Sequence, residues 1–262
     1  MPFKTLLFFC IVFSFSCKNT PQHISKLGNP QPAANISSDK NPYRNIKTIP
    51  LPEGYTRVNA DSGSFAGWLR NAGLKESKTV YLYNGTPKAN QRAQFAVLDI
   101  PVGNKNLQQC ADAVMRLEAE YLFAAKKYQE ISFTDNENGV YNFTPPYTRE
   151  HFSSFMERVF GMCGSASLSK QLRTVPDFAA IEPGDVLIRG GFPGHAAIVM
   201  DVAENKAGNK VYLLAQSYMP AQDIHVLVNP MDESLSPWYK VSDSKQVYTP
   251  EYLFYTNELK QW

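Results

Sequence analysis

Apolar and polar positions follow two different periods along the chain. Helical spacing is clearest after residue 106, where apolar side chains recur three or four positions apart: Leu107, Cys110, Val114, Leu117 and Tyr121. This spacing predicts a helix over residues 107–128, with Asn106 and Gln109 forming a capping box at its start. Similar patterns predict shorter helices over residues 64–71 and 150–162.

Strand patterns dominate the later part of the chain. Three apolar runs separated by short turns predict consecutive strands at residues 184–188, 196–202 and 211–215. Two earlier strands are expected at residues 79–83 and 93–100, paired through the Asn84-Gly85 turn. A last short helix or strand is expected near residues 250–255. Helices followed by a cluster of strands predict an α+β fold in a single domain.

The first residues have the pattern of an export signal. Lys4 precedes an apolar run that is too short to span a bilayer but has the length of a signal-peptide core. The run ends in Phe15-Ser16-Cys17, which resembles a bacterial lipobox. That resemblance implies cleavage before Cys17 and acylation of its thiol. An ordinary signal peptide with an incidental cysteine is the alternative.

The segment after Cys17 is polar and rich in Pro, Asn and Ser, which predicts a flexible tether. We therefore divide the chain into a lipoprotein signal peptide (1–16), the lipidated Cys17 with its tether (17–45) and one folded domain (46–262). Lys18 stands where an inner-membrane retention signal has Asp. By the same resemblance, the protein is anchored in the outer membrane of the cell envelope and faces the periplasm.

Composition narrows the candidate partners. The 26 basic and 24 acidic residues nearly balance, so the charge gives no reason to expect nucleic acid as a partner. Aromatic residues make up 13% of the chain, which argues against general disorder. The membrane, reached through Cys17, is the partner that the sequence predicts.

Two cysteines remain in the expected domain once Cys10 leaves with the signal and Cys17 is acylated. Cys110 and Cys163 can form a disulfide, can both be buried thiols, or can leave Cys110 as a nucleophile. At the start of a long helix, backbone N–H groups and the macrodipole favour a thiolate and would lower the pKa of Cys110. Cys163 lies near a helix C-terminus, where the dipole has the opposite effect.

A histidine opens the second of the three consecutive strands. His195 follows the glycine-rich turn at residues 190–194, in which Gly194 allows close backbone approach. It is either a catalytic base or a histidine that caps the hairpin. Gln216 lies at the end of the next strand.

These segments resemble the papain-like hydrolases of bacterial cell walls, the CHAP and NlpC-type families. The resemblance covers residues 106–218 and rests on Gln109-Cys110 and on the Gly194-His195 strand. It implies a papain-like helix plus antiparallel sheet, with Cys110 as nucleophile, His195 as base, Gln216 as the orienting residue and Gln109 as an oxyanion donor. Gln216 departs from the family pattern because it carries no charge.

The sequence after Cys110 also lacks the aromatic residues usual in CHAP domains. The helix at 150–162 is therefore a second candidate for the nucleophile helix. It offers Ser153 or Ser154 and no cysteine, which would make the domain inactive.

Over residues 46–262 the chain also resembles a family of uncharacterised lipoproteins from Bacteroides-type bacteria, which brings no known activity. The combined prediction is a cysteine hydrolase or amidase that cleaves an acyl or peptide bond, with cell-wall peptide as a candidate substrate and without a metal or cofactor. The alternative is an inactive, lipid-anchored binding or scaffolding protein. Two polar groups are expected at the surface: the pair Asp223 and His225, and the charged face of the 107–128 helix, which includes Asp112.

Overall fold

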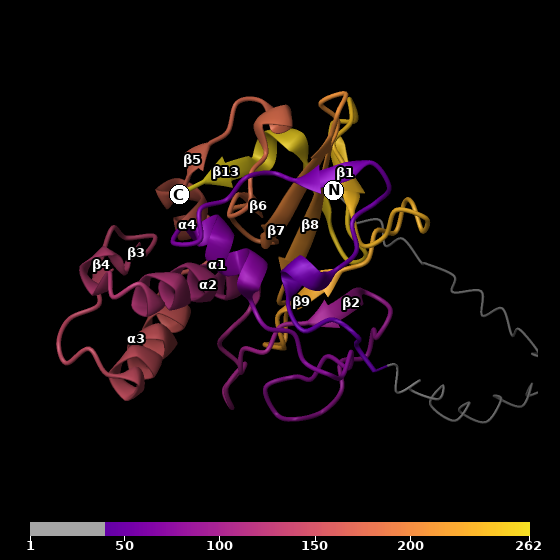
Figure 1. Ribbon diagram of the computed structural model, residues 1–262. Helices are drawn as coiled ribbons and strands as arrows, with labels where there is room; N and C mark the ends of the chain where they lie inside the picture. Colours follow the sequence, from indigo (N-terminus) through magenta and orange to yellow (C-terminus); the bar gives the residue numbers. More distant parts are fainter. Residues whose placement is uncertain (1–39) are drawn as a thin grey trace, which may run out of the picture. The chain divides into compact units, whose positions relative to one another are not determined.

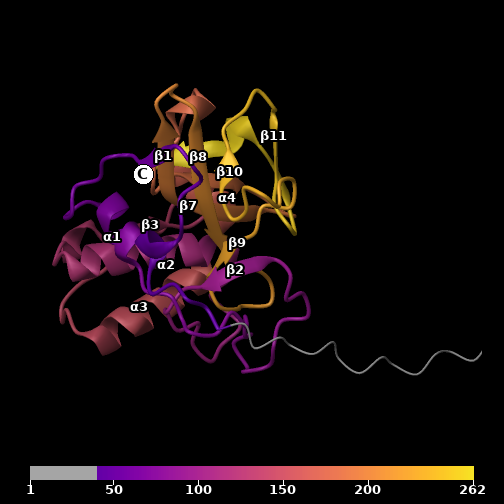
Figure 2. The same cartoon turned by 45° about the vertical axis from the view of Figure 1, so that its right-hand side comes forward.

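Nine β-strands form one antiparallel sheet through the centre of the fold, which is described by a computed structural model covering residues 40–262 (Figure 1). The strand order is β2-β9-β8-β7-β6-β13-β5, with β1 paired to β7 and β10 to β8. Figure 2 shows β9 and β2 continuing the sheet from β8. The strands of this sheet are β1 (Tyr55–Arg57), β2 (Gln94–Val97), β5 (Arg173–Thr174), β6 (Val186–Arg189), β7 (His195–Asn205), β8 (Lys210–Gln216), β9 (His225–Leu227), β10 (Tyr239–Lys240) and β13 (Leu259–Gln261).

The central strands β6, β7 and β8 are the three consecutive strands that the sequence predicts. Both faces of these strands are covered, which explains why their sequences are almost continuously apolar. Ile188 and Ile198 face a core shared with the helices, whereas Leu187 and Val199 face a second core on the opposite side. This alternation follows the two-residue period of a strand.

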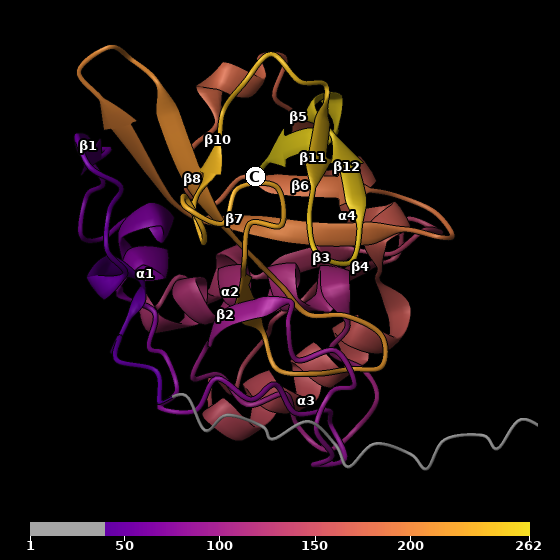
Figure 3. The same cartoon turned by 90° about the vertical axis from the view of Figure 1, so that its right-hand side faces the viewer.

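Helices cover one face of the sheet. They are α1 (Phe65–Asn71), α2 (Cys110–Ala124), α3 (Arg149–Met162) and α4 (Ser165–Gln171). Ser64 caps α1 by accepting a hydrogen bond from the backbone of Gly67, and Thr148 caps α3 in the same way. In Figure 3, α2 and α3 lie below the central strands. The hairpin of β11 (Gln246–Tyr248) and β12 (Leu253–Tyr255) contributes Val247 and Phe254 to the second core, on the other face of the sheet. The predicted combination of helices and an antiparallel sheet is confirmed.

Several local predictions are wrong. Residues 79–83 form no strand with residues 93–100; their backbone instead bonds to residues 221–223, a distant segment. A small hairpin, β3 (Ser132–Thr134) with β4 (Val140–Asn142), was not predicted. Helix α4 and four 3-10 helices were also not predicted; the latter are η1 (Ile46–Thr48), η2 (Tyr128–Glu130), η3 (Phe178–Ala180) and η4 (Thr256–Glu258).

The predicted signal peptide, Cys17 and most of the predicted tether lie outside the described residues. Within the last part of that tether, Asn41 is 5% exposed and its side-chain amide donates to the carbonyl of Lys75 at 2.9 Å. Among the helices of the described part of the chain, none is long and apolar enough to cross a membrane.

Candidate functional site

Cys110 is the first residue of α2. The backbone N–H of Gln109 donates to the carboxylate of Asp112 at 2.9 Å, which makes Gln109 the N-cap residue. The helix begins three residues later than predicted because Asn106 does not cap it. Its side-chain oxygen instead accepts from the backbone of Ala221 at 2.8 Å. Cys110 thus lies even closer to the helix N-terminus than the sequence suggested.

His195 is the first residue of β7, directly after the glycine-rich turn. A Cβ atom at Gly194 would lie 2.3 Å from the hydroxyl of Ser165 and 2.4 Å from the carbonyl of Gly191. The close approach expected at Gly194 is therefore confirmed, and it fixes how the chain enters β7. The imidazole is 2% exposed and lies among three aromatic rings with centroid distances of 4.7–5.6 Å: Tyr218, Tyr252 and Phe254.

Cys110 and His195 line one cavity of about 480 Å³. The cavity opens at the end of the sheet where β7 begins. Its wall also includes Cys163 and the side chain of Phe192, which is 96% exposed. The backbone N–H of Ala196 faces the sulfur of Cys110, so the thiol lies beside the residue that follows His195.

The imidazole and the sulfur approach the cavity from different sides of the sheet. The ring of His195 stacks on Phe254, which belongs to the core on the β11–β12 side, whereas α2 packs on the other face. Within residues 40–262, no hydrogen bond joins the Cys110 sulfur to the imidazole. The ring of Tyr218 contacts the imidazole and lines the same cavity as the sulfur. Burial is the main cause that raises the pKa of its phenol, followed by Glu251 and then Cys110.

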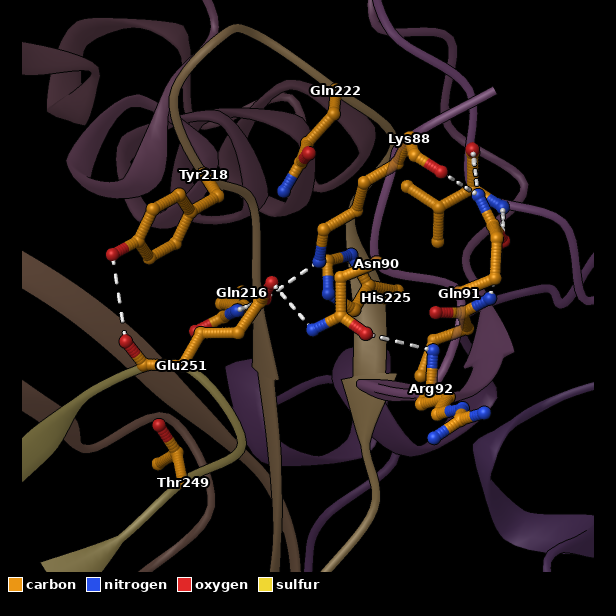
Figure 4. A network of polar contacts seen from close by, with 12 residues as sticks. Lys88, Asn90, Gln91, Arg92, Gln216, Tyr218, Gln222, His225, Thr249 and Glu251 are labelled. Atoms are coloured by element: carbon orange, nitrogen blue, oxygen red, sulfur yellow. Dashed lines mark hydrogen bonds and ion pairs between the residues drawn. The ribbon is translucent and has the colours of Figure 1, made fainter. Parts of the chain in front are cut away.

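Gln216 is hydrogen-bonded to the imidazole of His195, and its predicted orienting role stays a prediction. Its side-chain oxygen lies 2.7 Å from Nε2 of His195. The other ring nitrogen, Nδ1, has no hydrogen-bond partner among the described residues. The Gln216 amide in turn donates to Glu251 at 3.0 Å, and Figure 4 shows Lys88 and Asn90 donating to the same carboxylate.

Burial determines the protonation of both candidate catalytic groups. Loss of solvation, followed by the nearby Asp112 carboxylate, raises the pKa of Cys110 to about 11, although the backbone N–H groups of Ala111 and Ala196 act in the opposite direction. Burial lowers the pKa of His195 to about 4. The predicted lowering of the Cys110 pKa by the helix N-terminus is therefore wrong. At neutral pH the site holds a thiol and a neutral imidazole.

This protonation state predicts slow alkylation of Cys110 at neutral pH. Because the thiolate is the reactive form, we expect its rate with iodoacetamide to rise about tenfold per pH unit from pH 7 to 10 without reaching a plateau. Mass spectrometry of the Cys110 peptide measures the rate. A titration midpoint below the free-thiol value of about 8.5 that shifts in His195→Ala would instead indicate a thiolate–imidazolium pair.

Comparison with known proteins identifies the family. A model described as "Domain of unknown function (4846)" matches residues 46–145 and 134–261, which together span most of the chain. The chain belongs to this family. No curated protein and no solved structure gave a significant match. The predicted membership of an uncharacterised family is thus confirmed, while the likeness to CHAP and NlpC domains receives no support from these comparisons.

The second cysteine of this family member is not bridged to the first. Cys110 and Cys163 are both free and both buried, so the disulfide interpretation is not what the structure contains. Burial is the main cause that raises the pKa of Cys163 to about 11, followed by Asp135 and Asp112. The alternative nucleophile helix, α3, has Thr148 as its N-cap residue, and neither Ser153 nor Ser154 lines the Cys110 cavity.

Two groups expected at the surface are buried. Asp112 is 6% exposed, and burial raises its pKa to about 8. Asp223 and His225 are 2% and 0% exposed, and the imidazole bonds to the backbone carbonyl of Asp223 rather than to its carboxylate. On the same helix as Asp112, Arg116 and Glu120 form an ion pair at 2.8 Å.

Gln109 lines the cavity with a half-buried side chain, whose amide donates weakly to Asn106 at 3.5 Å. Its oxyanion role stays a prediction. Across the part of the chain that the structure describes, no three His, Cys, Asp or Glu side chains are grouped as ligands for a metal ion.

Proposed function

We propose that this protein is a cysteine hydrolase or amidase of papain-like type that cleaves an acyl or peptide bond. One observation carries the proposal: Cys110, at the start of a helix, and His195, with Nε2 held by Gln216, line the same cavity. A nucleophile, a base and a residue that orients the base are the three groups such chemistry requires.

The reaction follows from the resting protonation states. As the Cys110 sulfur attacks the acyl carbon, its proton moves to Nδ1 of His195, and a carbon–sulfur bond forms. His195 then gives this proton to the departing amine or alcohol as the bond to it breaks, which leaves a thioester. Water attacks the thioester while His195 accepts one of its protons, and the released sulfur takes that proton back to regenerate the thiol.

Backbone N–H groups at the start of α2 are candidates for stabilising the oxyanion. The first N–H groups of a helix have no partner within it, and those of Cys110 and Ala111 face the sulfur. The Gln109 amide, with only a weak bond to Asn106, is the side-chain candidate.

The cavity favours an uncharged acyl group. Its lining contains no Lys, Arg or Glu, and Asp112, its one acidic residue, is largely protonated at neutral pH because burial raises its pKa to about 8. Phe192 and Met219 add an apolar rim that is 96% and 55% exposed. A cell-wall peptide would bind here through an uncharged portion rather than through its carboxylates.

The proposal places this chemistry in the cell envelope, with the protein anchored through acylated Cys17 in the outer membrane and facing the periplasm. The lipobox-like Phe15-Ser16-Cys17 and the polar segment after it support this location. The mass of the mature N-terminal peptide tests it: a diacylglyceryl-modified Cys17 is expected, and a peptide with an unmodified cysteine would contradict the anchor.

The experiment for the activity is capture of the thioester. The full chain is incubated with neutral N-acyl amides and esters and, in parallel, with cell-wall peptides; each reaction is quenched in acid and analysed by mass spectrometry. We expect the mass of the acyl group on the Cys110 peptide and release of the amine or alcohol. Release of the amine or alcohol without an acyl adduct on Cys110 would contradict the mechanism.

One observation favours a second function. Burial raises the pKa of Cys110, and within the described residues the sulfur makes no hydrogen bond to the imidazole. Both features are those of a cavity that binds a ligand without catalysing a reaction. The alternative is a lipid-anchored binding or scaffolding protein of the cell envelope. Under this alternative, neutral acyl compounds bind in the cavity and protect Cys110 from alkylation but are not turned over.

A further inference from the structure

A chain of hydrogen bonds continues from the imidazole to a buried ion pair. His195 is bonded to Gln216 at 2.7 Å, and Gln216 to Glu251 at 3.0 Å. Lys88 donates at 2.6 Å to the carboxylate oxygen of Glu251 that also accepts from Gln216, and the side-chain amide of Asn90 donates to the other oxygen at 3.0 Å. The Lys88 and Glu251 side chains are only 7% and 14% exposed. Figure 4 shows the part of this network around Glu251.

The ion pair of Lys88 and Glu251 determines which group donates and which accepts in each of these hydrogen bonds. Lys88 can only donate, and an ionised Glu251 can only accept. The amide group of Gln216 that faces Glu251 must therefore be the NH₂, which turns its oxygen toward His195. That oxygen only accepts, so Nε2 of His195 must carry the ring proton, and Nδ1 is left with a free lone pair.

We propose that Glu251, held by Lys88, is a positioning residue that fixes the tautomer of His195 through Gln216. The pair gives the site what Gln216 cannot supply by itself: a defined direction for its amide, with the NH₂ toward Glu251 and the oxygen toward His195. Nδ1 is the atom that must accept the thiol proton in the proposed reaction, so this inference rests on the proposed function for its catalytic meaning.

The charges of the pair act on His195 in opposite directions. Burial is the main cause that lowers the pKa of the imidazole; the hydrogen bond with Gln216 and then the Glu251 carboxylate raise this pKa, and Lys88 lowers it. The other titratable groups around the ring are Cys110 and Asp112 on α2, Tyr218 and Tyr252 against its faces, and His225 on β9. Because two opposite charges largely cancel at the ring, we expect the amide direction to contribute more than the net field.

The test compares the imidazole of the full chain with that of Glu251→Gln by ¹⁵N NMR, with His195→Gln used to assign the signal. In the unchanged protein we expect the proton on Nε2 and a bare Nδ1. In Glu251→Gln the side chain at 251 can also donate, so Gln216 is free to turn. We expect a mixture of tautomers and, with a substrate, a fall in kcat of about tenfold to hundredfold with little change in KM.

Glu120→Gln is the matched control. Glu120 is also a carboxylate with a side chain 12% exposed and two cationic partners, Arg116 and Arg149, but it touches no member of the His195 chain. We expect it to leave the His195 signal unchanged. A proton on Nδ1 in the unchanged protein, or an identical tautomer in Glu251→Gln, would overturn the inference. A tautomer shift in a protein without hydrolase activity would support the positioning role and reject only the proposed function.

Discussion

Replacing Cys110 with alanine should abolish thioester formation and lower kcat/KM for acyl substrates by about a thousandfold or more. The sulfur is the only atom of this residue that can attack the acyl carbon. Cys110 is small and only 9% exposed at the first position of α2, where alanine is readily accommodated, so the fold should persist. Product release is measured by chromatography and unfolding by circular dichroism.

Cys163→Ala is the control for this substitution. It removes the other free cysteine that lines the cavity, which is the C-cap residue of α3 and not the first residue of a helix. We expect it to keep most of the rate. Equal rates in the Cys110→Ala protein and the unchanged protein would show that any hydrolysis does not pass through a thioester and would favour the binding function.

Local sequence patterns were sufficient to predict the strands that surround the candidate site. The apolar runs of β6, β7 and β8 identify consecutive strands because neighbouring strands joined by short turns pair with each other. Their order then places His195 and Gln216 on adjacent strands, within hydrogen-bond reach. Gly194 could be predicted because a backbone that leaves no room for a Cβ atom requires glycine.

Tertiary contacts determine what the sequence could not show. The start of α2 depends on a bond between Asn106 and Ala221, residues far apart in the chain. Lys88 and Glu251 are separated by 163 positions and lie in segments without a motif, so no local signal connects them to His195. The direction of the Cys110 pKa shift was also inaccessible, because a helix N-terminus is visible in the sequence whereas the extent of burial is not.

The largest loss of stability is expected from Asp201→Ala. The Asp201 side chain is fully buried in β7, where one oxygen accepts from Arg57 at 2.6 Å and the other from Arg70 at 2.7 Å. These two arginines hold β1 and α1 against the sheet. Without the carboxylate, two guanidinium groups that are only 15–18% exposed lose their counter-ion. We expect the free energy of unfolding to fall by about 3–5 kcal/mol in urea titrations.

The surface pair of Lys105 and Glu157 provides the contrast for this prediction. The Lys105 nitrogen lies 2.7 Å from the Glu157 carboxylate, a distance similar to those at Asp201, but the two side chains are 60% and 44% exposed. Water can replace either partner, so Glu157→Ala should leave the urea midpoint unchanged. Because both variants lose an ion pair and only one of these pairs is buried, the difference between their free energies of unfolding measures the effect of burial. If Asp201→Ala were equally mild, the two arginines must reach solvent without their carboxylate, and the ion pairs would not be what holds β1 and α1 in place.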